Sequence, residues 1–376
     1  AKWSALDFNT KSNAVRLNGF ALAEDSGVTW LNSFRKSRPV EMELAEYMPS
    51  NTAYYSFLGY GNYRDYRARK SDIIRRTNRA YSFDKTRESY DSSCKCDMED
   101  LAAGWIGSQA AMFIVEPASE NYEQNRFAAF SAQDGSDAVA KLRELAAKMN
   151  EVKDAEPEEV DYQDRQIFRL RVGDFYGDVF GGEFAGLSDP YVTRVDEVIV
   201  MAQSLNAMRV LINAIDARRT LARDNAYRNL TKEVARESNF MIYSSLSRSP
   251  AIYKHVLKDQ YASTLEGHTP LLRKFQSFVY QVSHYKVDLY YNQAFLRYHP
   301  GYSPETNALW EARLEAPVAY PPTFFTNHYT GDLEILVQDS AGRLYLLDNK
   351  GEILWKRKLP QTIQGDIHQV DVFKND

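Results

Sequence analysis

The sequence predicts an α+β fold in which helices pack on antiparallel sheets in two related halves, followed by an all-β, propeller-like blade. Over residues 1–305, strand and helix patterns are mixed without the strict alternation of one strand and one helix that marks a parallel sheet. Helical periodicity stops near residue 309, where short strands and glycine turns take over. A chain of 376 residues is long enough for two or three domains. We expect their boundaries at 1–155, 156–305 and 306–376.

The first half begins with short alternating strands between residues 3 and 19, and Asn18-Gly19 is the expected hairpin turn. Residues 52–59 predict an aromatic-rich strand. A helix is expected next, with Tyr63 to Thr77 along one face, and seven cations lie in the sixteen residues 64–79, which we interpret as a solvated helical face rather than an anion-binding patch.

The end of the first half predicts a strand pair and a helix. Residues 110–116 and 126–131 predict two paired strands joined by a polar loop. The clearest helix covers 138–149, where apolar residues recur every three or four positions, with Asp134 or Ser136 as its N-cap. This run predicts a core-facing stripe.

The second half follows an acidic segment over residues 151–161, centred on Pro157, which predicts an exposed loop or a sub-domain boundary. The pattern then begins again. Thr269-Pro270 should open a helix whose inner face extends to Val282, because an N-cap residue is followed by proline at the first helical position. The other expected elements are strands at 166–172, 195–202, 239–246 and 286–298, and helices at 205–215 and 225–236.

The tail contains an internal repeat. Leu309-Trp310-Glu-Ala-Arg-Leu314 is echoed by Leu354-Trp355-Lys-Arg-Lys-Leu359 at a spacing of 45 residues. Between them lie three predicted strands joined by two glycine-containing hairpins, at residues 339–342 and 348–351. This is the period of a β-propeller blade. Because one blade cannot close a ring, we expect the natural protein to continue beyond residue 376.

Composition excludes several classes of protein. Hydrophobic residues make up 44% and charged residues 26%, which is typical of a globular chain. The net charge of −5 and the pI near 5.8 lack the basic surface that phosphate-backbone binding needs, so nucleic acid is not an expected partner. No window approaches eighteen consecutive apolar residues, so we expect no membrane span.

The start of the chain contains neither an initiator methionine nor a signal-peptide core. We therefore expect it to begin inside a longer gene product, with any membrane contact made through an anchor that precedes Ala1.

Two cysteines, Cys94 and Cys96, are separated by one residue. A zinc site needs about four ligands, and no second cysteine pair is present. A disulfide between them closes only a strained ring, so we favour two ordinary thiols over a structural disulfide or over redox or metal chemistry. The cysteines alone do not indicate the compartment.

Several segments resemble a known family. Pro49-Ser-Asn-Thr-Ala-Tyr-Tyr-Ser56, residues 98–111, the strand and helix over 127–149, and residues 195–202 with Asn206 and Leu221-Ala222 are similar to bacterial envelope proteins of the domain of unknown function 3352 family. The likeness covers about residues 40–300. Residues 3–7 and 18–20 resemble versions from the Bacteroidetes, and the tail resembles a quinoprotein-type propeller blade. The first resemblance implies an extracytoplasmic protein tethered by an N-terminal segment, and it transfers no functional residue.

Motifs that carry chemistry are not found in the sequence. The six histidines show no metal-binding spacing, and we expect surface or turn positions for His255, His268, His284, His299, His328 and His368. No nucleophile elbow, phosphate-binding loop or calcium loop occurs. We therefore predict no catalytic residue, no metal ligand, no cofactor-binding residue and no cofactor.

Three features leave alternatives open. Adjacent carboxylates such as Asp196-Glu197 and Glu158-Glu159 should point to opposite faces of an extended segment, although pairing between distant strands stays open. The glycines at 181, 182 and 186 fit a lid or, more simply, a connector. The 25 tyrosines fit sugar stacking or protein contacts, but packing explains much of their number.

The leading functional hypothesis is a non-catalytic scaffold or interaction module in the bacterial envelope, periplasmic or at the cell surface, with a protein partner. The alternative is a glycan-binding or carbohydrate-active envelope protein whose site lies between the α+β module and the propeller. A quinone-dependent dehydrogenase is disfavoured because one blade provides no cofactor site. We lean against an enzyme.

Overall fold

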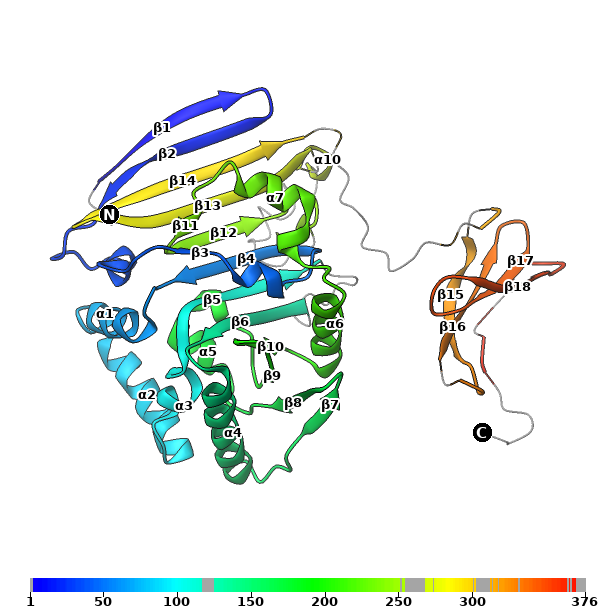
Figure 1. Ribbon diagram of the computed structural model, residues 1–376, viewed down its shortest axis with the longest axis horizontal. Helices are drawn as coiled ribbons and strands as arrows, with labels where there is room; N and C mark the ends of the chain where they lie inside the picture. The colour runs from blue at the N-terminus through cyan, green and yellow to red at the C-terminus, as the bar shows by residue number, and fades with distance from the viewer. Residues whose placement is uncertain are drawn as a thin grey trace. The chain divides into compact units, whose positions relative to one another are not determined.

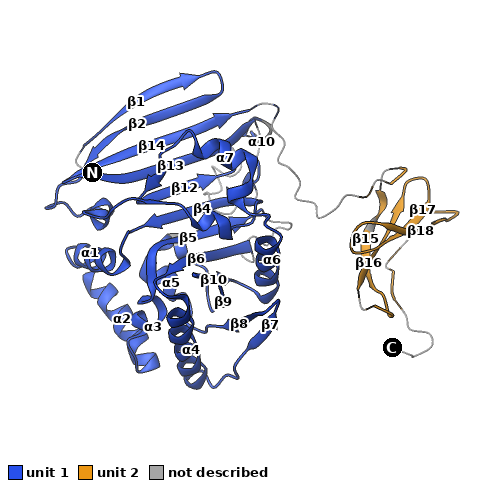
Figure 2. Cartoon of the chain, in the orientation of Figure 1, with its two compact units in different colours: residues 1–304 blue, residues 305–376 orange. Residues whose placement is uncertain are grey.

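The computed structural model describes residues 3–116, 125–250, 252–253, 268–272, 274–299, 301, 312, 314–316, 318–330, 332–363, 365 and 367–369. The chain divides into two compact units, residues 1–304 and 305–376 (Figure 2). Among the described residues, no helix combines the length and the apolar character needed to cross a membrane.

The first unit is built on one twelve-stranded sheet in which every neighbouring pair is antiparallel (Figure 1). The strand order is β1-β2-β14-β13-β12-β4-β5-β6-β10-β9-β8-β7. Because β6 pairs with β10, the sheet continues across the acidic segment at residues 151–161. The strands are β1 (Trp3–Lys11), β2 (Ala14–Leu22), β4 (Thr52–Gly59), β5 (Ile106–Val115), β6 (Arg126–Ala132), β7 (Glu159–Tyr162), β8 (Arg165–Arg169), β9 (Tyr191–Val195), β10 (Val198–Ala202), β12 (Phe240–Ser244), β13 (Phe275–Lys286) and β14 (Leu289–Tyr298).

Helices cover both faces of this sheet, and each face has its own core. Successive strand residues alternate between the two cores, as with Leu58 in the first and Phe57 in the second. The first face carries α1 (Tyr63–Arg75), α2 (Ala80–Cys94), α3 (Met98–Ala103), α4 (Gly135–Val152), α5 (Phe175–Phe180) and the short 3-10 helices η1 (Trp30–Phe34) and η4 (Gly182–Phe184). The second face carries α6 (Leu205–Asp216), α7 (Asn225–Thr231) and the 3-10 helices η2 (Leu44–Tyr47) and η5 (Leu221–Arg223). A short two-stranded sheet, β3 (Val40–Glu41) with β11 (Glu237–Ser238), and the short helix α10 (Thr269–Leu272) complete the unit.

Strand β10 lies between the two helix layers. Ile199 and Met201 belong to the core under α4, whereas Val200 and Ala202 belong to the core under α6. All five residues of β10 are buried. A strand covered on both faces needs apolar residues at every position, which explains its uninterrupted apolar sequence.

Several sequence predictions are confirmed. The strand at 52–59 is β4, the predicted pair at 110–116 and 126–131 is β5 with β6, and the helix at 205–215 is α6. Helix α4 contains the predicted helix at 138–149, and the Asp134 side chain caps it by accepting hydrogen bonds from the N–H groups of Ser136 and Asp137.

The predicted hairpin turn at Asn18-Gly19 is wrong. The turn lies at residues 12–13, and Gly19 lies in the middle of β2, paired with Leu6 of β1. Glycine is required here for close approach rather than for a turn, because a Cβ at this position would collide with the backbone carbonyl of Ala5.

Two further predictions need correction. The expected helix after Thr269 ends at Leu272, and residues 275–286 form β13. Residues on β13 face both cores, with Val279 in one and Val282 in the other. Because both faces of the strand carry apolar residues, their spacing along the sequence matched the spacing expected for a helix. The expected single strand at 195–202 is the hairpin of β9 and β10, with Asp196 in a left-handed turn conformation at φ 53°.

The second unit contains a four-stranded antiparallel sheet in the order β15-β16-β17-β18. Its strands are β15 (Val318–Thr326), β16 (Leu333–Asp339), β17 (Arg343–Leu347) and β18 (Ile353–Lys358). Both predicted hairpins form, and each has a glycine at positive φ, Gly342 at 79° and Gly351 at 84°. The first repeat element, Leu309-Trp310, lies outside the described residues.

Candidate functional site

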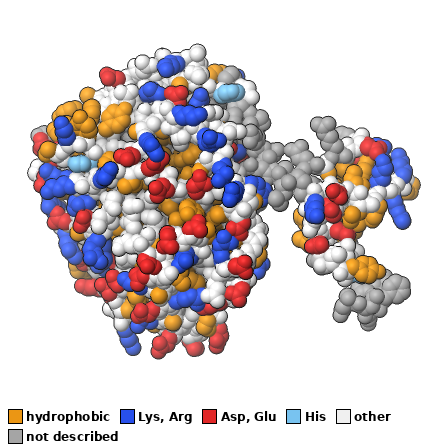
Figure 3. Space-filling model, viewed as in Figure 1, with side chains coloured by type: hydrophobic (Ala, Val, Ile, Leu, Met, Phe, Trp, Pro, Cys, Tyr) orange, Lys and Arg blue, Asp and Glu red, His pale blue; other side chains and the backbone are white. Residues whose placement is uncertain are grey.

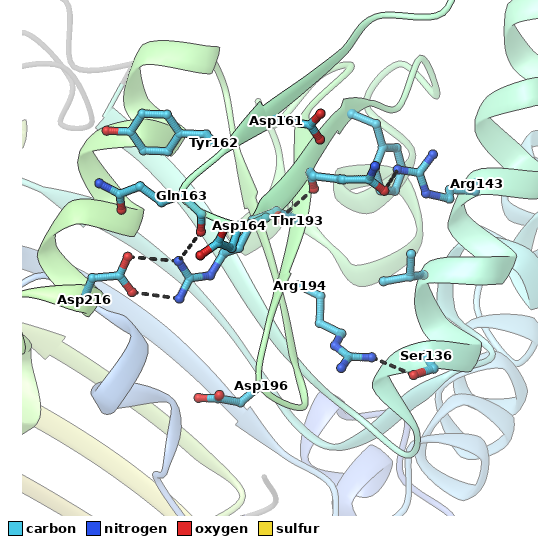
Figure 4. A pocket seen from close by; sticks show the side chains of 14 residues that line it. Ser136, Arg143, Asp161, Tyr162, Gln163, Asp164, Thr193, Arg194, Asp196 and Asp216 are labelled. Atoms are coloured by element: carbon cyan, nitrogen blue, oxygen red, sulfur yellow. Dashed lines mark hydrogen bonds and ion pairs between the residues drawn. The ribbon is translucent and has the colours of Figure 1, made fainter.

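A polar cleft opens where β8 and β9 separate. These strands pair only at Phe168 with Val192 and at Arg169 with Tyr191, whereas β9 pairs with β10 along its whole length. The resulting space has a volume of about 1480 Å³ and is open to solvent. We call it the fork cleft. Figure 4 shows its labelled side chains, which come from the β7–β8 hairpin, from β9 and the turn after it, from α4 and from the end of α6.

Two tight turns border the fork cleft at the same end of the sheet. Gln163 and Asp164 join β7 to β8 and both take positive φ, 47° and 60°, as the mirror-image turns of two-residue hairpins require. Asp196 occupies the corresponding position between β9 and β10. The left-handed backbone of these turns therefore sets the directions in which the side chains of Gln163, Asp164 and Asp196 leave the chain at the mouth of the cleft.

Ion pairs join the elements that border the cleft. The Arg165 guanidinium donates to both oxygens of Asp216 at the end of α6, with N–O distances of 2.9 and 2.7 Å. On the opposite side, Arg143 of α4 donates to Glu159 at 2.7 Å and to the amide oxygen of Gln166 at 3.1 Å. These bonds tie both helix layers to the β7–β8 hairpin.

Guanidinium groups cover aromatic rings at the cleft. The Arg143 guanidinium lies 4.8 Å from the ring centroid of Phe168, and the Arg209 guanidinium lies 5.4 Å from that of Tyr162. The Tyr162 hydroxyl donates to Asn213 at 2.9 Å. One face of each ring is thus occupied, which leaves a lining of charged and amide groups rather than an open stacking platform.

The adjacent carboxylates Asp196 and Glu197 point to opposite sides of the sheet. The Tyr47 hydroxyl of η2 donates to Asp196 at 3.2 Å, and the N–H of Gly135 at the start of α4 donates to Glu197 at 2.6 Å. Partial burial, together with the charge of Asp196, raises the pKa of Tyr47 to about 12. The two residues lie in the β9–β10 turn rather than in the extended segment that the prediction assumed, and each carboxylate has its own partner on its side of the sheet.

The carboxylates nearest the tip of the β7–β8 hairpin are free. Asp161 and Asp164 line the cleft and are exposed, and within the described part of the chain neither side chain accepts a hydrogen bond or forms an ion pair. Arg194 of β9 donates to the Ser136 hydroxyl at 2.7 Å on the other side of the cleft. The fork cleft therefore presents two unpaired negative charges at one edge.

The basic helix α1 is engaged within the molecule. Arg67 of α1 and Arg87 of α2 each form an ion pair with Glu99, and Glu99 is only 5% exposed. Lys70 donates to the carbonyl oxygens of Val179 and Phe180 at 3.1 and 2.5 Å. In Figure 3 acidic and basic side chains alternate over this region. Arg67 and Lys70 therefore hold neighbouring elements together, whereas Arg64, Arg75, Arg76 and Arg79 are exposed, as the prediction of a solvated face requires.

The structure joins Cys94 and Cys96 by a disulfide, so the favoured interpretation of two free thiols is wrong. Lys95 between them adopts a left-handed conformation, φ 52°, as the C-cap of α2. This turn brings the two Cα atoms to 5.2 Å, within the ordinary disulfide range.

The other candidate features are structural in the described residues. Phe180 and Phe184, beside the glycines at 181, 182 and 186, are buried in the first core, so this loop is a packed connector rather than a lid. In the parts of the chain described above, no three His, Cys, Asp or Glu side chains gather in a group able to hold a metal ion. His255 lies outside the described residues.

Sequence reasoning missed the fork cleft because its residues come from three distant segments, near 136–143, 161–168 and 193–216. The signal that could have indicated the hairpin of this cleft is the alternating strand pattern beside the two-residue turn at 163–164. Comparisons with protein-family models, with curated proteins and with solved structures found no match to this chain.

Proposed function

We propose that this chain is a non-catalytic interaction module of the bacterial envelope that binds a protein partner through the fork cleft. The proposal rests on two carboxylates, Asp161 and Asp164, that have no ion-pair partner within the described residues. The hairpin that bears them is held rigid by the Arg165–Asp216 and Arg143–Glu159 ion pairs. A rigid edge with fixed negative charge suits a Lys- or Arg-bearing protein surface, because charge complementarity selects partners and speeds association.

A polypeptide suits this cleft better than a sugar. Sugar recognition commonly uses an uncovered aromatic face, and guanidinium groups already cover one face of Phe168 and of Tyr162. The arginine, tyrosine and acidic groups that line the fork cleft are typical of the polar part of a protein interface.

Two observations support an envelope location. The Cys94–Cys96 disulfide is typical of proteins that fold in an oxidising compartment. The segments similar to the domain of unknown function 3352 family also favour an extracytoplasmic, membrane-tethered protein. Fractionation of the native host should then recover the protein from the periplasm or the outer surface, whereas recovery from the cytosol would contradict this part of the proposal.

We also propose that the second unit is one blade of a β-propeller. Strands β16 and β17 carry apolar residues on both faces, with Val337 and Tyr345 on one and Leu336 and Leu344 on the other. A lone sheet leaves one such face in water, whereas propeller blades stack face to face. Sequencing the gene beyond residue 376 tests this directly: further 45-residue repeats are expected, and a stop codon would overturn the blade.

The interaction is tested by photo-crosslinking in the native host. A benzoylphenylalanine placed at Gln163, at the mouth of the cleft, should give one discrete protein adduct, and the same group at Tyr81, 77% exposed on α2, should not. Adding Asp161→Asn and Asp164→Asn should remove most of the adduct. Equal adducts from both positions, or turnover of a polysaccharide or peptide by the full chain, would contradict the proposal.

A further inference from the structure

A second concave surface lies on the sheet face that carries α6 and α7, far along the sheet from the fork cleft. Its floor is a row of side chains that the strand register places side by side: Phe20 of β2, Tyr291 of β14 and Ser283 of β13. Its wall is the two-stranded sheet of β3 and β11, which contributes Glu41 and Glu237. The enclosed volume is about 690 Å³. We call it the aromatic groove.

Three rings gather in this groove and are open to solvent. The Phe20 ring lies 5.3 Å from that of Tyr285 and 5.6 Å from that of Tyr291, at interplanar angles of 57° and 64°. Tyr285 is 56% exposed and Phe20 36% exposed. Figure 3 shows hydrophobic side chains gathered over these ends of β1, β2 and β14. The Lys286 ammonium lies 5.5 Å from the ring centroid of Tyr285, whereas within the described residues no cation lies over the rings of Phe20 and Tyr291.

Hydrogen-bonding groups border the rings. Arg236 pairs with Glu41 at 2.9 Å, and both side chains are exposed, while Glu237 adds a second exposed carboxylate. Apart from the rings, the apolar lining is limited to Pro39 and Ala235. The groove therefore combines three aromatic rings with charged groups at its border.

A second pocket, of about 350 Å³, lies further along β2, at Asn18 and Arg16. The chain from Glu233 to Glu237 borders both, held to β14 by Gln293, which accepts from the Ala235 N–H at 2.9 Å. The second pocket is lined by the amides of Asn9, Asn13 and Asn18. From Phe20 to Arg16 the strand advances four residues, roughly 13 Å at about 3.3 Å per residue.

We propose that this surface binds an extended glycan chain, with a sugar ring stacked on the aromatic groove. The C–H face of a pyranose packs on an aromatic ring, and its hydroxyl groups donate to carboxylates and accept from guanidinium and amide N–H groups. The aromatic groove supplies both kinds of contact on rigid strands. The Asn18 amide, two residues from Phe20 on the same face of β2, gives a following sugar unit a partner.

The test uses isothermal titration of the whole 376-residue chain with cellohexaose, chitohexaose, mannohexaose and hexagalacturonate. We expect at least one to bind saturably. Tyr285→Ala should weaken that affinity at least tenfold, about 1.4 kcal/mol, and Tyr285→Phe should retain it because the ring remains. The matched control is Tyr81→Ala, which removes a similarly exposed tyrosine from α2.

Three outcomes would overturn the glycan site. The first is that none of the four saccharides binds with a Kd below about 1 mM. The second is that Tyr81→Ala weakens binding as much as Tyr285→Ala does. The third is that Tyr285→Ala abolishes association with a protein or a second copy while no saccharide binds. Asp161→Asn with Asp164→Asn should leave glycan affinity unchanged, which separates this site from the fork cleft.

Discussion

Arg165 and Asp216 form a two-pronged ion pair that ties the start of β8 to the last residue of α6. The two side chains are 24% and 36% exposed, so water screens part of the attraction. The planar guanidinium nevertheless matches the carboxylate with two parallel hydrogen bonds, which a lysine cannot reproduce. This pair fixes the distance between the hairpin tip and the helix layer on its side of the fork cleft.

A double-mutant cycle on this pair should give a modest coupling energy. Arg165→Lys, Asp216→Asn and the double variant are compared by urea unfolding, and we expect coupling of about 0.5–1 kcal/mol because the pair is partly exposed. Each single variant should also raise the rate of amide hydrogen exchange at the β7–β8 turn, and we expect this change to be easier to detect than the change in the free energy of unfolding. Coupling near zero with unchanged exchange would show that the pair does not order the cleft.

The buried carboxylate of Glu99 should matter much more for stability. Glu99→Gln keeps the size of the side chain but leaves Arg67 and Arg87 without their common counter-charge, and we expect a loss of about 3 kcal/mol in the free energy of unfolding. The measurement is the urea midpoint at constant m-value. Glu88→Gln on the exposed face of α2 is the control and should shift the midpoint little. Similar midpoints for both variants would contradict the structural role of Glu99.

The N-cap of α4 should make stability depend on pH. Hydrogen bonds from the N–H groups of Asp137 and then Ser136 hold the pKa of Asp134 below its usual range. A lowered folded-state pKa means that the charged carboxylate stabilises the fold above its unfolded-state pKa, near 3.9, and that this contribution is lost as the pH falls through the lower folded value.

Asp134→Asn is the matched variant for this prediction, because it keeps an oxygen acceptor but removes the titration. Thermal unfolding between pH 6 and pH 2 should show a smaller loss of Tm for the variant than for the natural chain. Asp134→Ala should lower Tm already at neutral pH, since it removes the cap itself. If Tm falls by the same amount between pH 6 and pH 2 for the natural chain and for Asp134→Asn, this prediction is wrong.

Gly19 should be intolerant of a side chain. Gly19→Ala places a Cβ against the Ala5 carbonyl of β1, so we expect β1 to detach from β2 and its amide protection to fall at least tenfold while β4 stays protected. Gly182→Ala is the control, because no atom lies within 4 Å of a Cβ built there. If the amide protection of β1 is unchanged in Gly19→Ala, the prediction is wrong, because the strands then accommodate the methyl group without loss of pairing.

Reduction of the Cys94–Cys96 disulfide should affect stability only slightly. The bond closes a very short loop, and the chain-entropy model gives less than about 2 kcal/mol for such a loop. Urea unfolding with and without reductant measures the difference, and thiol titration of the folded protein purified without reductant should find no free thiol. Two titratable thiols in the folded protein would contradict the bond.

Local patterns predicted the elements that bury one stripe or lie in a simple hairpin. Residues 138–149 place Leu142 and Leu145 on one face of α4, and this period is visible without tertiary information. Strand β13 was missed because it lies inside the sheet and faces two cores, which imitates a helical pattern. Gly19 was misassigned because its role depends on the approach of β1, which no local rule contains.

The candidate site was harder to predict than the fold. The pairing of Arg165 with Asp216 depends on the strand order β10-β9-β8-β7 and on the placement of α6, and sequence spacing specifies neither. The aromatic groove likewise depends on the register that sets Phe20 beside Tyr291, residues from opposite ends of the first unit. The abundance of tyrosine indicated aromatic surfaces but not their positions.

The pairing of β2 with β14 also constrains the order in which the protein acquires its structure. Leu22 pairs with Leu289, so the β1–β2 hairpin has no neighbour in the sheet until nearly the whole first unit has been synthesised. One edge of β2 is unpaired during that interval. Co-expression of a holdase chaperone that shields this edge should therefore raise the yield of folded protein more than it raises the stability of the finished chain.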